Sequence, residues 1–276
     1  MKKIKSLILC LFLALTQFTY AYDWENCSLS AGVEVVTNYN WRGTNIGGLS
    51  TQPWVEFSAY GFNIGAWGSA GSGIHDDFNQ FIPELDLYIS YTTPDEHFTL
   101  GLTHYYYFDD HFFNYSYDLN KVGTTQSEIS VNFLVSEDYP FEFGAAMMFG
   151  GGDCYQSYSM DTIKTPDGNP QKLYSTYIYL KYTLELGNVT LVPEIGLSPH
   201  KSMYTYYDYD PITGRSYHHN FAFNNLSCTA YWNFYESKLV SMYCTGNFFF
   251  NFFDTCFRPF EYGKNACVSV GLGIEL

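Results

Sequence analysis

Acidic side chains recur at alternate positions of several short segments, and they have the clearest capacity for chemistry. Glu34, Glu84 and Asp86 stand in runs whose other positions are apolar. Carboxylates gathered on one polar surface attract cations or bind them through oxygen. Two bases share their parity, Arg42 and Lys181. The acids of this kind are Glu34, Glu56, Glu84, Asp86, Glu128, Glu142, Glu185, Glu194 and Glu275.

Aromatic residues share the parity of these acids. Trp54, Tyr60, Trp67, Tyr177 and Tyr179 are the members of this set. Such rings stack on a sugar or a nucleoside, or they fill the interior of a barrel that has few strands. Both interpretations stay open at this point.

Paired acids and histidines elsewhere suggest metal binding less strongly. Paired carboxylates can bind calcium, but an EF-hand spacing is missing, which favours solvated loop acids. His218 and His219 have no Cys or carboxylate at metal-ligand spacing. We therefore expect no metal site and no cofactor. The paired acids are Asp76-Asp77, Asp109-Asp110, and Asp208 with Asp210.

Catalysis is a rival interpretation. His104 and His200 are candidate bases for a serine hydrolase, which needs a base beside its nucleophile. Neither has a neighbouring Ser that forms a unit in the sequence. Asp109-Asp110 with His111 fits a membrane protease only as any acidic loop would. We expect that the chain is not an enzyme.

Strands must position these side chains, as the stretch from Leu29 to Gly43 illustrates. Residues at odd positions from Ala31 to Trp41 are apolar or aromatic except Thr37, and most even positions are polar. A period of two predicts a strand with one apolar face and one polar face.

The same unit recurs to the end of the chain and predicts twelve strands. Short turns alternate with long loops between them, which is typical of an antiparallel outer-membrane barrel with periplasmic turns and extracellular loops. The predicted strands are 28–42, 51–60, 62–70, 81–92, 96–108, 125–136, 139–150, 172–186, 188–199, 218–233, 237–251 and 265–276. The predicted turns are Tyr60-Gly61, Thr93-Pro94-Asp95, Glu137-Asp138, Gly187-Asn188 and Phe234-Tyr235-Glu236.

Parity assigns the apolar positions to lipid and the acids to the lumen. A charged side chain that faces lipid costs about 2–4 kcal/mol at the bilayer centre for Arg or Lys, and less for an acid. The acidic lumen is either a cation-attracting pore or a solvated interior that merely avoids lipid. The predicted pore-lining residues are Glu34, Asn38, Arg42, Glu56, Trp67, Glu84, Asp86, Glu128, Glu142, Lys181 and Glu194.

The N-terminus has the pattern of an export signal. Lys2, Lys3 and Lys5 precede the apolar run Leu7 to Leu15, and Ala21 ends a small-residue cleavage site. We expect a signal peptide at 1–21 and a barrel at 22–276. The net charge of −15 argues against nucleic acid as a partner. Aromatic residues make up 20% of the chain, which suits the girdles of a membrane barrel.

Two strands near the C-terminus carry further signals. The pattern of 218–233 shifts phase near Asn224-Asn225, which predicts a bulge. The last strand, Ala266 to Leu276, is amphipathic, and we expect the barrel-assembly machinery to read it. Leu276 departs from the usual aromatic final residue.

Six cysteines follow the signal peptide. Cys228 and Cys244 each lie eight residues from Glu236. A turn at Glu236 would place them opposite each other, so we predict a bridge or a close contact. Cys154 and Cys256 lie on loops of one rim, and the set also includes Cys27 and Cys267.

Three short segments resemble the TorF-type family of outer-membrane porins. They are Asn38-Tyr39-Asn40-Trp41-Arg42-Gly43, Gln52-Pro53-Trp54-Val55 and Gly65-Ala66-Trp67-Gly68. The resemblance implies an outer-membrane barrel. Together with the parity of the acids, it leads us to expect a passive, cation-preferring channel for small hydrophilic solutes. A non-conducting surface or adhesion barrel and an outer-membrane hydrolase are the alternatives. The expected partners are outer-membrane lipid, hydrophilic solutes or cations, and the assembly machinery.

Overall fold

A computed structural model describes residues 27–72, 81–108, 112, 125–153, 172–205, 207–210, 215–218, 220–250 and 266–276. The predicted signal peptide, Cys154 and Cys256 lie outside these residues. Within them, no helix is long and apolar enough to cross a membrane.

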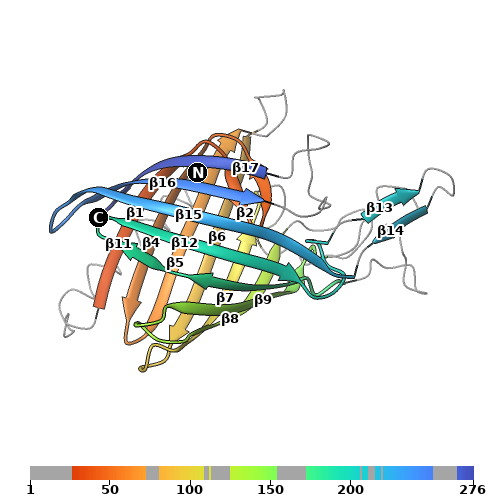
Figure 1. Cartoon of the computed structure of the whole chain (residues 1–276), viewed down its shortest axis with the longest axis horizontal. Helices are drawn as coiled ribbons and strands as arrows, with labels where there is room; N and C mark the ends of the chain where they lie inside the picture. The colour runs from red at the N-terminus through yellow and green to blue at the C-terminus, as the bar shows by residue number, and fades with distance from the viewer. Residues whose placement is uncertain are drawn as a thin grey trace.

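The described residues form a closed antiparallel barrel of twelve strands (Figure 1). β10 and β11 are two parts of one strand, interrupted at Thr183, and both pair with β12. β17 pairs with β1 and closes the ring. The barrel strands are β1 (Cys27–Val36), β4 (Ser50–Ala59), β5 (Phe62–Ser72), β6 (Phe81–Thr92), β7 (Phe98–Tyr106), β8 (Gln126–Leu134), β9 (Phe141–Gly151), β10 (Thr176–Tyr182) with β11 (Leu184–Leu186), β12 (Val189–Ser198), β15 (Ala222–Glu236), β16 (Ser241–Phe250) and β17 (Ala266–Glu275).

Two short hairpins are not part of the ring. β2 (Tyr39–Trp41) pairs with β3 (Thr44–Gly47), and β13 (Tyr207–Asp210) pairs with β14 (Arg215–His218). The prediction of one strand over 28–42 is therefore wrong beyond Val36. The prediction of twelve barrel strands is confirmed.

The Tyr60-Gly61 turn shows why the short connections are tight. Tyr60 has a φ of 52° and Gly61 a φ of 82°. Positive φ at both central residues is the geometry of a type I′ turn, whose twist matches that of the two strands it joins. Tyr60 is exposed at this turn, so the expectation that it faces the lumen is wrong.

The turn predicted at Phe234-Tyr235-Glu236 lies further along the chain. β15 continues to Glu236, with a register shift between Asn233 and Tyr235. The turn closes at Ser237, whose amide donates to the Val240 carbonyl at 2.8 Å. The aromatic run therefore stays within the strand.

This register separates the two cysteines expected to meet. Cys228 lies opposite Phe248, and Cys244 lies opposite Trp232. Four strand residues span about 13 Å, whereas a disulfide requires Cα atoms within about 7 Å. The predicted contact is wrong, and both cysteines are free thiols.

The bulge expected near Asn224-Asn225 is confirmed. Gly196 pairs with Asn225, but the next residue, Leu197, pairs with Phe223. Asn224 is the extra residue and is fully buried. Its side-chain amide donates to the Tyr204 carbonyl at 2.9 Å, so the bulge holds a loop segment against the barrel wall.

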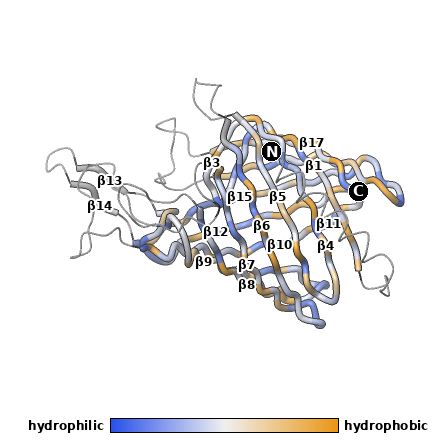
Figure 2. Tube along the Cα trace, turned by 180° about the vertical axis from the view of Figure 1, so that it is seen from behind, coloured by the Kyte–Doolittle hydropathy of each residue, from blue (hydrophilic) through white to orange (hydrophobic). Residues whose placement is uncertain are grey.

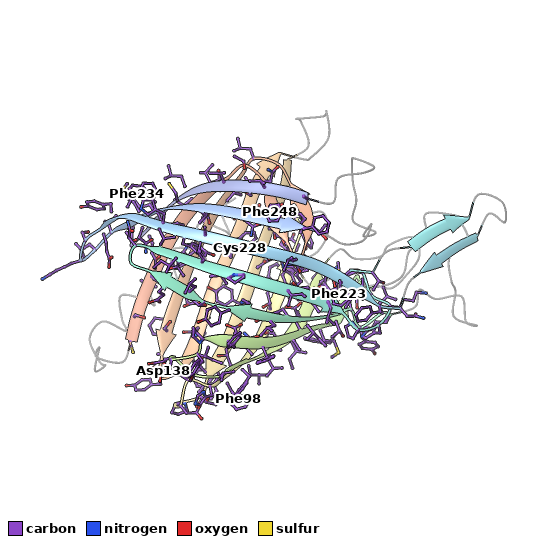
Figure 3. All side chains as sticks on the ribbon, viewed as in Figure 1. Phe98, Asp138, Phe223, Cys228, Phe234 and Phe248 are labelled. Atoms are coloured by element: carbon purple, nitrogen blue, oxygen red, sulfur yellow. The ribbon has the colours of Figure 1, made fainter. Side chains whose placement is uncertain are left out.

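The exterior of the barrel is apolar. Hydrophobic and hydrophilic residues alternate along the strands (Figure 2), and large apolar side chains occupy the exposed positions. Phe98, Phe223 and Phe248 are among them (Figure 3). The outward positions predicted from parity that are exposed include Val55, Leu87, Ile89, Leu100, Leu102, Ile129, Val131, Phe141, Phe143 and Ile195.

Candidate functional site: the lumen and its inward hairpin

The chain leaves the barrel wall directly after β1. The Thr37 amide donates to the Val270 carbonyl at 2.9 Å, and the Asn38 side-chain amide donates to the Val268 carbonyl at 2.9 Å. Ser269 Oγ donates to the Asn38 carbonyl at 2.7 Å. These contacts hold the base of the β2–β3 hairpin on β17.

A two-residue turn forms the tip of this hairpin. Arg42 has a φ of 49° and Gly43 a φ of 77°, which again is type I′ geometry. A Cβ added to Gly43 would lie 2.5 Å from the Asn224 carbonyl oxygen and 2.6 Å from the Asn225 Cβ. The tip therefore packs directly against the backbone of β15, at a distance that only glycine permits.

Arg42 fastens the tip to the opposite wall. Its guanidinium donates to both oxygens of Glu128, at 2.6 and 2.9 Å, and to the Tyr204 hydroxyl at 2.5 Å. The Tyr105 hydroxyl donates to Glu128 at 3.1 Å. The Arg42 Cζ lies 4.5 Å from the Trp41 ring centroid and 5.4 Å from that of Tyr204. We call Arg42, Trp41, Tyr105, Glu128 and Tyr204 the Arg42 latch.

The hairpin and the latch together join strands that lie on opposite sides of the ring. With β1 counted as the first strand of the ring, β8 is the sixth and β17 the twelfth, so the strands that anchor the tip and the base face each other. The Arg42 and Glu128 side chains are only 13% and 4% exposed. In such a buried pair, loss of one partner leaves an uncompensated charge and costs about 3–5 kcal/mol.

A second polar cluster supports the wall next to the latch. The Tyr177 hydroxyl lies 2.5 Å from Glu194 Oε1 and 2.6 Å from Asn225 Oδ1. Lys181 Nζ lies 3.3 Å from Glu142 Oε1. Side chains on the inner surface therefore join β9, β10, β12 and β15, in addition to the backbone hydrogen bonds between these strands.

A cavity of about 390 Å³ that opens to the lumen lies between the hairpin and the wall. Acids, aromatic rings and uncharged polar groups line it, and among the residues that the structure describes neither Lys, Arg nor His belongs to the lining. The lining residues are Glu34, Val36, Asn38, Tyr39, Asn40, Trp41, Gln52, Trp67, Asp86, Tyr88, Thr103, Tyr105, Thr229, Tyr231, Thr245, Asn247 and Ser269.

Four groups account for the residues predicted to line a pore. Glu34, Asn38, Trp67 and Asp86 line the cavity, and Arg42 with Glu128 forms the centre of the latch. Glu84 is buried and accepts a hydrogen bond from Tyr39. The remaining residues contact other side chains of the wall: Glu56 with Tyr88, Glu142 with Lys181 and Tyr179, and Glu194 with Tyr177.

Tyr39, Trp41 and Tyr204 are among the aromatic residues of the site that were not predicted to face the lumen. Tyr39 and Trp41 were expected on the lipid side, because their parity continues that of β1. The turn at Thr37 and Asn38 brings both into the lumen instead. The Arg42-Gly43 pair was the available signal, since it suits a hairpin turn. Tyr204 follows β12 in a loop, and nothing in its sequence context indicates that it folds inward.

A buried carboxylate organises the loop that carries Tyr204. Asp153 accepts hydrogen bonds from the Ser175 amide at 2.8 Å and from Ser175 Oγ at 2.5 Å. Burial raises the pKa of Asp153, and the hydrogen bonds from Ser175 oppose that change. The Met203 amide donates to Ser175 Oγ at 2.7 Å, which ties the loop to the start of β10.

One pair on the outer parity has the composition of a catalytic dyad. His104 Nδ1 lies 3.0 Å from Ser127 Oγ, because the two residues are directly opposite on β7 and β8. His104 Nε2 lies 2.9 Å from the Phe112 carbonyl oxygen. Ser127 is only 6% exposed. Ser127 is 23 residues from His104 in the sequence, and only the pairing of β7 with β8 brings the two side chains together.

The closed ring and its apolar exterior define the class of this protein. A barrel without free strand edges satisfies its backbone hydrogen bonds internally, as a bilayer requires. Apolar side chains face outward and charged side chains face inward, which is the distribution of outer-membrane barrels. The chain is an outer-membrane β-barrel, and its exterior contacts lipid.

Comparisons with known proteins give distant structural likenesses. No protein-family model matches the chain, and no curated protein matches it. The toluene transporter TodX of Pseudomonas putida has a TM-score of 0.40 and 7% identity, covering 94% of this chain and 90% of its own. An outer membrane phospholipase of Salmonella typhi has a TM-score of 0.36 and 11% identity, and the match covers 90% of this chain and 89% of the phospholipase. A porin has a TM-score of 0.33 and 10% identity, and the match covers 90% of this chain and 99% of the porin. The TorF-type resemblance stays a prediction.

Proposed function

We propose that the protein is a channel for passive diffusion of small hydrophilic solutes, that it prefers cations, and that the β2–β3 hairpin sets its constriction. The carrying observation is the charge balance of the inner surface. Both inward bases are already paired, Arg42 with Glu128 and Lys181 with Glu142. Within the described residues, the other predicted lumen acids have no basic partner in an ion pair: Glu34, Glu56, Glu84, Asp86, Glu185, Glu194 and Glu275.

This balance favours cations for a general electrostatic reason. Charges of one sign around a narrow aqueous path focus the potential along it. The screening length is about 10 Å at 0.1 M salt, so acids on the wall act across the whole of a small lumen. The TorF-type resemblance supports the channel part of the proposal. The first motif of that resemblance, Asn38 to Gly43, contains the turn of the hairpin that we propose as the constriction.

Planar-bilayer recording of the purified chain tests the proposal. Discrete conductance steps are the expected result. A folded, inserted protein that passes no current would contradict the channel proposal and favour a surface barrel that acts through its loops. Barrel insertion is checked independently by protection from protease in vesicles.

Lipid-ester hydrolysis is the second candidate function, and the contact between His104 and Ser127 is the observation that favours it. A serine-reactive phosphonate would label the wild-type chain but not the Ser127→Ala variant if this pair were catalytic. The low exposure of Ser127 leads us to expect no labelling. Labelling with ester turnover would replace the channel proposal.

A further inference from the structure

The cavity under the hairpin combines carboxylates with aromatic rings, and no positive side chain of the described residues lines it. Glu34 and Asp86 are its acids, and six rings surround them. An anion would meet repulsion there and no counter-charge. A neutral polyol would leave both carboxylates uncompensated. The lining therefore suits a solute that is positively charged.

The aromatic rings point to an organic cation. Ammonium groups bind over the faces of Trp and Tyr rings, and an alkyl chain packs against the same rings. A bare divalent ion instead prefers a cage of several oxygen ligands. In the part of the chain that the structure describes, no group of three or more His, Cys, Asp or Glu could hold a metal. An alkylammonium uses both features of the lining.

Asp86 provides a specific place for an ammonium group. The residue is only 8% exposed, and it lines the cavity. Its Oδ1 has no hydrogen-bond partner within the described residues, although the Asp86 side chain is also hydrogen-bonded to the neighbouring acid Glu84. A buried acceptor without a donor is costly, so such an atom is rare unless something outside the protein pairs with it. A primary ammonium carries three donors.

The second acid lines the same cavity and offers a place for a second ammonium group. Glu34 is on β1 and Asp86 on β6, with β4 and β5 between them. Neighbouring strands are about 4.8 Å apart, so the two acids are about 14 Å apart around the curved wall and closer across the cavity. Both side chains line the cavity, so an aliphatic diamine has to bridge less than this distance along the wall.

The hairpin contributes its own residues to this cavity. Tyr39 and Trp41 line it from β2. The Tyr39 ring centroid lies 5.4 Å from that of Trp67 on β5, with an angle of 51° between the rings. The site is complete only while the hairpin lies across the lumen, so occupancy and constriction are linked.

We infer that this cavity binds small aliphatic amines, diamines in particular, with the ammonium groups at Asp86 and Glu34 and the alkyl chain against the Tyr39, Trp41 and Trp67 rings. The inference rests on the proposed channel function and names the solute class for it. The cavity volume of about 390 Å³ lies within the range of about 300–1,000 Å³ common to ligand pockets.

Calorimetric titration of the full-length barrel in detergent tests the inference. The probe is 1,4-diaminobutane, and 1-aminobutane and 1,4-butanediol are the matched controls. The diamine is expected to bind, the monoamine to bind about tenfold more weakly, since it loses one charge-assisted hydrogen bond, and the diol not to bind. Equal binding of diamine and diol, or binding of neither, would overturn the inference.

Variants locate the site. Asp86→Asn and Glu34→Gln are each expected to weaken diamine binding at least about tenfold, and two variants at separate positions guard against one that fails to fold. Glu275→Gln neutralises a residue outside the cavity lining and is expected to leave the affinity unchanged. If all three variants weaken binding alike, the diamine is a diffuse counter-ion and the site is refuted.

Ion selectivity separates this inference from the proposed function. A cation-selective channel that does not bind the diamine overturns only the inference. An anion-selective channel overturns the proposed function, and the inference falls with it.

Discussion

The Arg42→Gln variant tests the Arg42 latch most specifically. In the wild type the guanidinium makes two hydrogen bonds to Glu128 and one to Tyr204, while Glu128 is almost fully buried. Gln cannot reproduce the bidentate pair or the stacking on Trp41. Glu128 would be left as a buried charge without its partner, at a cost of about 3–5 kcal/mol.

That cost exceeds the stability of the hairpin on its own, since an isolated two-stranded hairpin is at best marginally stable. The tip is therefore expected to leave the wall. At 1.36 kcal/mol per factor of ten, the lower figure of about 3 kcal/mol corresponds to a rise of about a hundredfold in the ratio of displaced to latched hairpins. Single-channel recording should show a larger mean conductance for Arg42→Gln than for the wild type.

Two further variants complete this experiment. Adding Glu128→Gln to Arg42→Gln removes the stranded charge, so the double variant should conduct less than Arg42→Gln alone, as a coupled pair requires. Lys181→Gln breaks the other inward pair, whose side chains are 30% and 29% exposed. Such a pair contributes at most about 1 kcal/mol, and the conductance should not change. An Arg42→Gln channel identical to the wild type would refute the latch.

Three other expectations concern the turn, the topology and the thiols. Gly43→Ala should raise conductance as Arg42→Gln does, because its Cβ meets the backbone of β15, whereas Gly246→Ala meets nothing within 4 Å and should be silent. Impermeant probes on intact cells should reach the long loops after β9 and β12 but not Thr93–Glu96, and labelling of that short turn would invert the topology. Cys228→Ser should leave mobility on a non-reducing gel unchanged, since a bridge to Cys244 is precluded by the register.

The barrel could be predicted from the sequence because its cause is local. The strands share a period of two in their hydrophobic pattern. Lipid on one face and the polar lumen on the other select this alternation, because a charged side chain that faces lipid is costly. The bulge at Asn224 was also visible, as a shift of phase. The Cys228 register was not, because it depends on which residue closes the turn after Glu236.

The site was predicted in part. Parity placed Glu128 and Arg42 on the polar side but gave no sign that they meet, since they are 86 residues apart in the sequence. The inward turn of Tyr39 and Trp41 depends on contacts with β17 and β8, which are distant in the chain. Tyr204 joins through a loop whose position is determined by Asp153 and Ser175. Long-range contacts of this kind leave no local pattern to read.

The reversal potential under a KCl gradient tests the acid-lined channel most directly. We predict a cation-selective sign that weakens when salt is raised from about 0.1 M to 1 M, because the screening length falls from about 10 Å to 3 Å. The double variant Glu84→Gln/Asp86→Asn should weaken it as well, whereas Glu236→Gln, an exposed acid at the end of β15, should not. An anion-selective potential, or a cation-selective one that is unaffected by both salt and the double variant, would contradict the account.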